Sequence, residues 1–369
     1  MRVNDIFDKA TQFKVKTISV LMRYEIIPGM NGNVMKKYGV LLIGCGHIGK
    51  QHIEDIYYRD NINVHAVVDV NLEKAKLTAK KYGVKNYGTD YHEFLKSPEV
   101  DIVIIATYTS THLPILKDCL ANGKNVLCEK PIAANLEDGI EFRDLVKNAK
   151  QKVLVALVLR HNKSYNTIKK LIDDGEIGEL KVVRGTQSHH ATDWERDKAL
   201  LRDCSPVIDC AVHYFDVMQW YTGAKIVEVS GFGNKIEEDS PRYNYTLATV
   251  KLDNGCIGYF EAGWGNTIAS LNVKEFIGTK GRITHTLRDN RCQNREEGDL
   301  ISIFYSEGNE YRTLNVDSEY KNMYGQMETL IDMIENDSPG SPTMDEVYEA
   351  FYATVKADEA INTGTVIKL

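Results

Sequence analysis

The sequence predicts an α/β protein in which a doubly wound parallel sheet is followed by an α+β domain with a large, mostly antiparallel sheet. Apolar strands alternate with amphipathic helices between residues 36 and 158, which is the pattern of a parallel sheet. After residue 158 strand-like runs follow one another without intervening helices, and turns such as Asp253-Asn254-Gly255 separate them, which favours antiparallel pairing. The 369 residues are enough for two domains with separate cores.

The same patterns divide the chain into an N-terminal extension or arm at residues 1–35, a first domain at 36–158 and a second domain at 159–369. Near-continuous Val, Ile and Leu runs mark the first-domain strands, as expected for strands buried on both faces. We expect its strands at 38–43, 64–68, 101–106, 125–128 and 153–158, and its longer helices at 72–82, 112–122 and 136–149. We expect second-domain strands at 180–190, 226–233, 243–252, 256–264, 271–278 and 301–305, and two closing helices at 324–336 and 345–362.

The run Gly44-Cys45-Gly46-His47-Ile48-Gly49 closes the first strand and opens a helix, and Asp69 ends the next strand. Gly44 permits a tight turn, Gly46 lets the backbone approach a pyrophosphate, and Gly49 lets the helix lie close to the strand. The helix N-terminus then offers free amides to phosphate groups, and Asp69 can accept hydrogen bonds from a ribose diol. A structural turn without a ligand is the alternative, but the whole arrangement is typical of a dinucleotide-binding Rossmann domain.

Composition excludes several classes of protein. Apolar residues make up 43% of the chain and charged residues 26%, as in ordinary globular proteins. The net charge of -7 argues against nucleic acid or an anionic membrane as a partner. No apolar run approaches the roughly 20 residues that span a bilayer, and the first thirty residues contain no signal-peptide core. Seven scattered cysteines without a C-x-x-C pair suit free thiols in the cytoplasm.

Lys130 is the first candidate for chemistry. It lies in Glu129-Lys130-Pro131, directly after an expected strand, and ligands of parallel sheets bind beyond the carboxyl ends of the strands. A surface lysine is the alternative interpretation, although the following proline constrains the backbone there.

The segment from Asp209 to Asp216 is the second candidate. In a helix Asp209 and His213 share a face, and a carboxylate beside an imidazole raises its basicity and orients it for proton transfer. The alternative is an Asp–His pair that only stabilises the helix. Cys204, Cys210 and His213 together suggest a metal site, but a fourth ligand is missing, so we predict no metal. His189, His190, Trp194 and Arg196 form a polar and aromatic segment that suits a sugar or, equally, an exposed loop.

These residues together resemble the glucose–fructose oxidoreductase, inositol dehydrogenase and MocA family of nicotinamide-dependent oxidoreductases. The likeness covers residues 35–369 and is specific to the family but not to a substrate. It rests on the glycine-rich run, on Ala106-Thr107-Tyr108-Thr109-Ser110-Thr111-His112, on Glu129-Lys130-Pro131, on Tyr165 with residues 170–178, on Asp209 with His213, and on residues 276–281.

The resemblance implies that Lys130 lies near the nicotinamide and the substrate hydroxyl, that Asp209 binds substrate and that His213 is the acid/base. Tyr108 replaces the usual proline, and Cys204-Ser205 and Ala211 stand where the family often has glycines, so the substrate does not carry over. The implied cofactor contacts are Gly44, Gly46, His47, Ile48, Gly49, Asp69, Thr107, Tyr108, His112, Glu129 and Lys130. The implied substrate contacts are Arg160, Asn162, Tyr165, His190, Trp194, Arg196, Asp209 and His213.

We therefore expect an NAD(H)-dependent oxidoreductase that acts on a secondary hydroxyl of a sugar, glycoside or cyclic polyol. Three alternatives remain: a redox-assisted glycosidase or lyase that retains NAD, a reductase of an unsaturated or imine substrate, and a dinucleotide-sensing regulator without turnover. We also expect a homo-oligomer formed through one face of the second-domain sheet. Residues of the kind that such a face contributes are Val227, Val229, Thr246, Ala248, Val250 and Tyr259.

Overall fold

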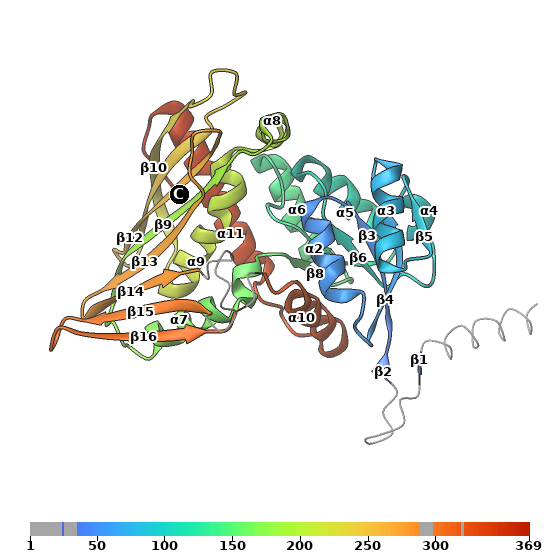
Figure 1. Cartoon of the computed structure of the whole chain (residues 1–369), viewed down its shortest axis with the longest axis horizontal. Coiled ribbons are helices and arrows are strands. Elements are labelled where there is room, and N and C mark those ends of the chain that lie inside the picture. The colour runs from blue at the N-terminus through green and yellow to red at the C-terminus, as the bar shows by residue number, and fades with distance from the viewer. Residues whose placement is uncertain (1–23, 26–34, 288–297, 319–320) are drawn as a thin grey trace, which may run out of the picture. The chain divides into compact units, whose positions relative to one another are not determined.

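The computed structural model describes residues 24–25, 35–287, 298–318 and 321–369 (Figure 1). It divides into two compact units, Met1–Ile104 and Ile105–Leu369. Of the expected N-terminal arm, only β1 (Tyr24–Glu25) and the beginning of β2 (Met35–Lys36) lie within the described residues, and these two short strands pair antiparallel. The domain limits 36–158 and 159–369 stay a prediction.

The first unit contains the start of the doubly wound sheet. Its β3, β4 and β5 pair in parallel, and β3 is buried along its whole length, as the run of apolar residues predicted. Asn71 caps the N-terminus of α3 by accepting a hydrogen bond from the Lys74 amide, and Gly83 ends that helix with a positive φ. The elements are β3 (Tyr38–Ile43), α2 (His47–Ile56), β4 (Ile62–Val68), α3 (Leu72–Tyr82), β5 (Asn86–Gly88), α4 (His92–Leu95) and β6 (Ile102–Ile105).

The complete sheet has six strands in the order β5-β4-β3-β6-β7-β8. This order is that of a doubly wound Rossmann sheet, which confirms the predicted fold class of the first domain. The strand expected at 153–158 is shorter, because the chain turns into a 3-10 helix at Val158. The second unit begins with η1 (Thr109–Thr111), α5 (His112–Ala121), β7 (Asn125–Cys128), α6 (Leu136–Asn148), β8 (Val153–Val155), η2 (Val158–His161) and α7 (Lys163–Asp173).

A nine-stranded sheet dominates the second unit, in the order β16-β15-β14-β13-β9-β12-β11-β10-β17. Only the β9–β12 pair is parallel, so the prediction of a mostly antiparallel sheet is confirmed. The expected strands did not include β14 and β16, whose polar and glycine residues hide the apolar alternation. The strands are β9 (Leu180–His190), β10 (Ile226–Asn234), β11 (Tyr245–Leu252), β12 (Ile257–Gly265), β13 (Leu271–Gly278), β14 (Gly281–Thr286), β15 (Asp299–Tyr305), β16 (Glu310–Val316) and β17 (Ile367–Lys368).

Helices cover one face of this sheet, which we call the inner face (Figure 1). There α11 (Met344–Thr363) packs on β10 and β11, α9 (Val212–Thr222) on β9, and α7 on β15. Val229, Thr246, Ala248 and Val250 are buried, so these four do not supply the exposed face for which they were suggested. Successive residues of a strand point to opposite faces of the sheet, and here the residues of both faces are apolar. Only the packing of the helices distinguishes the covered face from the open one.

Two helical segments precede α9. The segment that the sequence analysis interpreted either as sugar-binding or as an exposed loop contains helix α8 (Trp194–Asp203). Asp193 caps the N-terminus of this helix. A π-helical turn, η3 (Val207–Ala211), follows Pro206 and runs directly into α9. Helix α10 (Met323–Asn336) packs against β7 and β8. Helices α10 and α11 are the two expected closing helices, so both are present.

Candidate active site

The glycine-rich loop in the first unit has the geometry that a pyrophosphate needs. Gly44 has a φ of 98°, which only glycine adopts readily. A Cβ built on Gly46 meets no atom within 4 Å, so the backbone there faces open space. Helix α2 begins with His47, Ile48 and Gly49 and has no side-chain cap, which leaves its first amides for an anion.

Asp69 lies at the end of β4 beside this loop. One carboxylate oxygen accepts a hydrogen bond from the Cys45 amide (2.9 Å), and the other accepts one from the Asn71 amide (2.9 Å). These bonds fix the carboxylate, and each oxygen keeps a lone pair for a hydroxyl donor. The residues of the first unit therefore fit the pyrophosphate and ribose of a dinucleotide.

In the second unit Lys130 and Asp209 form an ion pair. The Lys130 Nζ donates to the Asp209 carboxylate (2.9 Å) and to the Asp209 backbone carbonyl (2.9 Å). Burial alone disfavours both charges, but their mutual attraction outweighs it, so the pKa of Lys130 is raised and that of Asp209 is lowered. The pair is thus ionised at neutral pH.

His213 lies on α9 just beyond the π-helical turn. Its side chain is buried, and its Nδ1 atom has no hydrogen-bond partner in the described part of the chain. Burial, and then the charges of Lys130 and Lys321, hold the pKa of His213 well below its usual value. The imidazole is therefore neutral at pH 7 and able to accept a proton.

The expected Asp209–His213 pair is not found. The Asp209 carboxylate is bonded to Lys130 and to the Cys210 thiol (3.5 Å) instead. The expectation assumed α-helical spacing, whereas Asp209 lies in a π-helical turn, which changes the face on which a residue four positions along lies. The Asp209 charge therefore acts on Lys130.

His189 and Lys321 interact electrostatically with Lys130 and Asp209. The sequence patterns did not single out Lys321. Burial lowers the pKa of His189, and Asp209, Lys130 and Lys321 are the charges that act on it. Burial also lowers the pKa of Lys321, with Glu129 opposing. His189 is the next-to-last residue of the long strand β9, so its place beside a strand terminus was a usable signal, whereas Lys321 has no motif around it.

The segment Thr107–His112 forms a loop that we call the cofactor loop, after its expected role. His112 is buried, and its ring nitrogens lie 2.9 Å from the Pro131 carbonyl oxygen and 3.2 Å from that of Thr107. His112 thus connects the loop to the turn that carries Lys130. Tyr108 is about half exposed, and Glu129 is buried.

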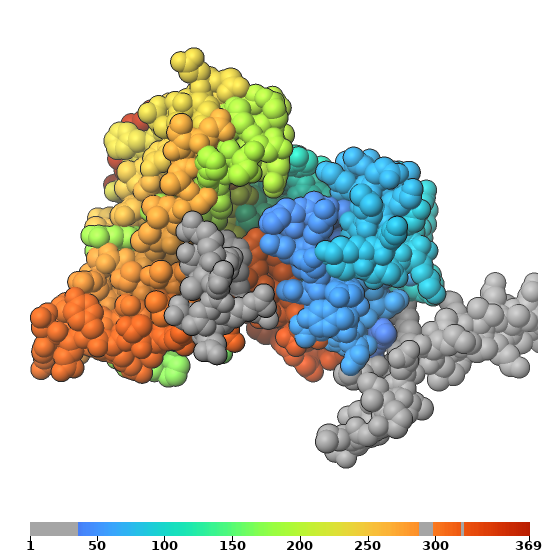
Figure 2. All heavy atoms as spheres, viewed as in Figure 1, coloured from blue at the N-terminus to red at the C-terminus, as the bar shows by residue number. Residues whose placement is uncertain are grey.

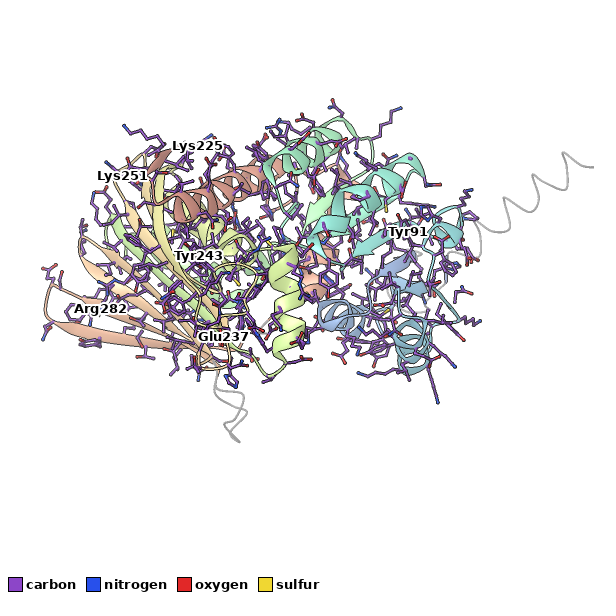
Figure 3. The ribbon with its side chains drawn as sticks, turned by 90° about the horizontal axis from the view of Figure 1, so that it is seen from above. Tyr91, Lys225, Glu237, Tyr243, Lys251 and Arg282 are labelled. Atoms are coloured by element: carbon purple, nitrogen blue, oxygen red, sulfur yellow. The ribbon has the colours of Figure 1, made fainter. Side chains whose placement is uncertain are left out.

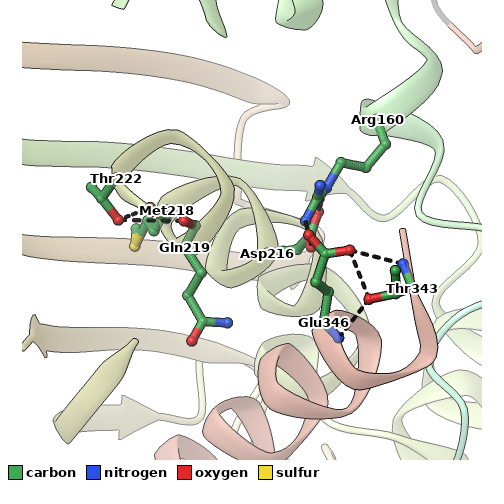
Figure 4. Close-up of polar contacts among 7 residues, drawn as sticks. All are labelled: Arg160, Asp216, Met218, Gln219, Thr222, Thr343 and Glu346. Carbon is green, nitrogen blue, oxygen red and sulfur yellow. Dashed lines mark hydrogen bonds and ion pairs between the residues drawn. The ribbon is translucent and has the colours of Figure 1, made fainter. Parts of the chain in front are cut away.

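Three expected substrate residues are engaged with protein groups, and Figure 4 shows the first of them, Arg160. Arg160 makes two hydrogen bonds with the Asp216 carboxylate (2.7 and 2.8 Å) and a third with Glu346 (3.2 Å). Asn162 caps α7, and the Tyr165 ring packs edge-on against His285. These contacts account for the three side chains without a substrate, and their role in substrate binding stays a prediction.

The other expected substrate residues lie near the surface of the second unit. The Trp194 Nε1 donates to Asp239 (2.8 Å), which ties the start of α8 to the loop before β11. Arg196 and His190 are exposed, and the His190 Nδ1 lies 3.3 Å from the Ile268 carbonyl oxygen. Their substrate contacts also remain a prediction.

Residues 35–287, 298–318 and 321–369 contain no cluster of three or more His, Cys, Asp or Glu side chains arranged for a metal. Six cysteines in these ranges are free buried thiols. Within the described helices, none is long and apolar enough to cross a membrane.

Comparison with known proteins identifies two family regions. Residues 38–157 match the model of an oxidoreductase family with an NAD-binding Rossmann fold, and residues 165–284 match the GFO/IDH/MocA C-terminal domain. The scyllo-inositol 2-dehydrogenase (NAD(+)) of Bacillus subtilis is 30% identical over 248 residues, which is 66% of this chain and 72% of that protein. The myo-inositol 2-dehydrogenase of Thermotoga maritima is 25% identical over 249 residues, which is 66% of this chain and 73% of that protein.

Among solved structures, scyllo-inositol dehydrogenase from Lactobacillus casei with NAD(H) and scyllo-inositol has a TM-score of 0.73 and 20% identity. The similarity covers 90% of this chain and 99% of that one and shows a shared fold. With the glycine-rich loop in a parallel sheet and both family regions in the expected order, the chain belongs to the GFO/IDH/MocA family of NAD-dependent oxidoreductases.

Proposed function

We propose that the protein is an NAD-dependent dehydrogenase that oxidises a secondary ring hydroxyl of a cyclic polyol, sugar or glycoside. The observation that carries the proposal is the Lys130–Asp209 ion pair in the same unit as a buried neutral His213, whose pKa is lowered by burial and then by the Lys130 charge. Oxidation of an alcohol requires a group that accepts the hydroxyl proton and a cation that stabilises oxygen as it gains negative charge. His213 and Lys130 supply these two functions.

Lys130 is the electrostatic partner of the reacting oxygen. Its Nζ has three protons, and two of them are donated to the carboxylate and the carbonyl of Asp209. The third remains for a substrate oxygen. Because Asp209 keeps the lysine charged and fixed, the ammonium does not reorganise as charge develops on that oxygen.

His213 is the proton acceptor. The pKa lowered by burial and by the two lysines keeps the imidazole unprotonated, and it becomes a cation only when it takes the hydroxyl proton. A cation beside Lys130 is unfavourable, so this proton then passes on to solvent or to another group. NAD, when bound, would supply the remaining chemistry as the hydride acceptor.

The cofactor residues fall into two groups. Gly44, Gly46 and the first turn of α2 would hold the pyrophosphate, and Asp69 the adenosine ribose. The cofactor loop and Lys130 belong to the second unit and would serve the nicotinamide end. The names of the inositol dehydrogenases among the relatives of this chain support a polyol substrate. The polar and aromatic residues His189, His190 and Trp194 support a hydroxylated ring.

Turnover on a defined panel tests the function. Purified protein is incubated with NAD and with myo-inositol, scyllo-inositol, aldohexoses and aryl glycosides, and NADH is followed at 340 nm while products are separated chromatographically. We expect NADH to form with at least one ring substrate. Release of the aglycone without net NADH would instead identify the redox-neutral glycosidase, and activity only on open-chain hydroxy acids would contradict the proposal.

We also propose that the protein acts in the cytoplasm as a homo-oligomer. The inner face of the nine-stranded sheet is covered by helices, whereas exposed apolar side chains lie on strands at its other face. They include Ile257, Leu271, Val273 and Leu300. A second copy would remove this apolar surface from water.

A further inference from the structure

Asp203 makes an unusual pair of contacts within the second unit. It is the last residue of α8, and its carboxylate accepts hydrogen bonds from the backbone amides of Thr109 (2.8 Å) and Ser110 (3.2 Å). Those amides belong to the cofactor loop, 94 and 93 residues earlier in the chain. One side chain thus holds two successive amides of the loop.

Helix electrostatics indicate that Asp203 serves the loop and not its own helix. A carboxylate in the last turn of α8 is unfavourable, because the C-terminus of a helix carries partial negative charge. At the start of η1, which leads into α5, the same carboxylate is favourable, since it satisfies amides that have no carbonyl partner in the helix. The bonds to the loop offset this local cost in α8.

A second set of contacts connects the loop to the turn that carries Lys130. At the other end of the loop, His112 lies within hydrogen-bonding distance of the carbonyls of Thr107 and Pro131, and Pro131 follows Lys130. The Thr111 hydroxyl also donates to the Thr107 side chain (2.7 Å). The loop is therefore fixed between Asp203 on one side and the Lys130 turn on the other.

We propose that Asp203 is a positioning residue for the nicotinamide end of the cofactor. This inference rests on the proposed function, in which the cofactor loop contacts the nicotinamide. Asp203 touches neither substrate nor cofactor. It holds the Thr109 and Ser110 amides, and through them the Thr107–Tyr108 backbone, in the conformation that the nicotinamide ring requires.

Comparing the binding of two ligands, NAD and ADP-ribose, distinguishes this role from a general effect on folding. NAD contains the nicotinamide, whereas ADP-ribose lacks it and keeps the groups that the first unit holds. Calorimetric dissociation constants for both are measured on the wild type, Asp203→Asn and Asp203→Ala. For Asp203→Ala we expect the constant for NAD to rise ~10-fold, since two charge-assisted hydrogen bonds are lost, and that for ADP-ribose to stay within ~2-fold. Asp203→Asn keeps one acceptor oxygen and should fall between.

Asp197→Ala is the matched control. It removes another carboxylate from α8, and no hydrogen bond to the Asp197 side chain is found among the described residues, so NAD binding should be unchanged. Amide hydrogen exchange, read by mass spectrometry without cofactor, gives an independent measure of the bonds themselves. We expect peptides that contain Thr109 and Ser110 to exchange faster in Asp203→Ala, while β9 peptides keep their protection.

The outcomes are distinct. Unchanged NAD affinity in Asp203→Ala, or an equal loss for NAD and ADP-ribose, overturns the positioning role. Unchanged exchange of the loop amides overturns it as well. A wild-type protein that binds NAD but oxidises no ring substrate contradicts the proposed function, and the comparison of NAD with ADP-ribose still decides the role of Asp203.

Discussion

At the scale of single residues, the candidate site combines charges that compensate one another with one imidazole that remains neutral. The Asp209 carboxylate makes Lys130 a permanent cation, and that cation in turn helps to keep His213 unprotonated. A base and an electrostatic partner with separated pKa values are what proton abstraction from an alcohol requires. The two groups therefore have different roles, which substitution can separate.

Replacement of either group should lower turnover without weakening the binding of the adenosine end of the cofactor. For Lys130→Met and His213→Ala we expect kcat to fall roughly 10²–10⁴-fold, because general acid–base assistance of this size is lost. Dissociation constants for ADP-ribose, which lacks the nicotinamide, should change little, since neither residue serves the adenosine end. Steady-state kinetics with calorimetry check this, and a His213→Ala variant with near-normal kcat would exclude His213 as the base.

Asp69 should select the cofactor. Its carboxylate repels a 2′-phosphate, and Val70 and Asn71 supply no cation beside it. We expect tighter binding of NAD than of NADP, and Asp69→Ala should reduce this preference. Titration calorimetry with both cofactors measures it, and equal or tighter binding of NADP by the wild type would contradict the assignment.

Lys274 is buried, with its Nζ 5.7 and 6.0 Å from the ring centres of Tyr165 and Tyr214. Burial lowers its pKa to about 7, although the Asp299 carboxylate opposes the shift. His285, which contacts Asp299 (3.2 Å), is another titratable group of this cluster. Between pH 7 and about 10 the unfolded chain binds a proton at Lys274 that the folded chain does not, so folding stability rises with pH in this range.

Lys274→Met should therefore stabilise the protein at and below pH 7, by up to about 5 kcal/mol for a shift of this size. The gain should shrink toward zero as the pH approaches 10. Urea unfolding at pH 7 and pH 9.5 measures the difference. Lys280→Met, which removes an exposed lysine from the turn after β13, is the control and should give no such pH dependence.

At the scale of elements, α9 is fixed by the buried contacts of Arg160. The Arg160 guanidinium, 4.6 Å from the Trp220 ring centre, connects η2 through Asp216 to α9 and through Glu346 to α11. The Glu346 carboxylate also accepts hydrogen bonds from the Thr343 amide and hydroxyl at the start of α11 (Figure 4). Because Asp216 lies three residues after His213, this network holds the helix that carries the proposed base.

Loss of one partner of this network should destabilise the fold. For Asp216→Ala we expect the free energy of unfolding to fall by about 3–5 kcal/mol, since Arg160 is left buried without its main counter-charge. The double variant Arg160→Met with Asp216→Leu should lose less than Asp216→Ala, because no charge remains unpaired. Urea denaturation of the variants tests this, and equal losses would contradict the explanation.

The sequence predicted strongly apolar or well-capped elements closely, since α3 and β13 have the expected limits. It also placed Lys130 after β7 and Asp69 after β4. It missed β14, β16 and α8, whose apolar residues are sparse and whose stability comes from neighbouring strands or from bonds such as Asp193 to Arg196. The π-helical turn leaves no sequence signal, so the Asp209–His213 geometry was wrong and the Asp209–Lys130 pair was missed.

At the scale of the whole molecule, the open face of the nine-stranded sheet is the proposed contact between copies. Strands β14, β15 and β16, orange in Figure 2, lie at the surface. Figure 3 labels Lys251 of β11 and Arg282 of β14 at the left of that view. Arg282 packs 4.6 Å from the Phe304 ring centre, so apolar and charged groups alternate along this face.

A charge on this face should separate the copies. We expect the wild type to sediment as a dimer or larger oligomer at micromolar concentration and Ile257→Lys to sediment as a smaller species. Leu77→Lys, an exposed leucine on α3 in the first unit, is the matched control and should leave the oligomer unchanged. A monomeric wild type in sedimentation velocity would exclude the interface.

The parallel β9–β12 pair affects the order in which the second unit acquires its structure. Strand β9 is the first strand of this sheet to be synthesised, yet its two neighbours are β12 and β13, about 70 to 100 residues later. Its backbone groups thus have no sheet partners until the ribosome has released residues 257–278. Pairing at such separation makes folding slow. During synthesis β9 is an unpaired strand, the kind of edge that chaperones must shield from other chains.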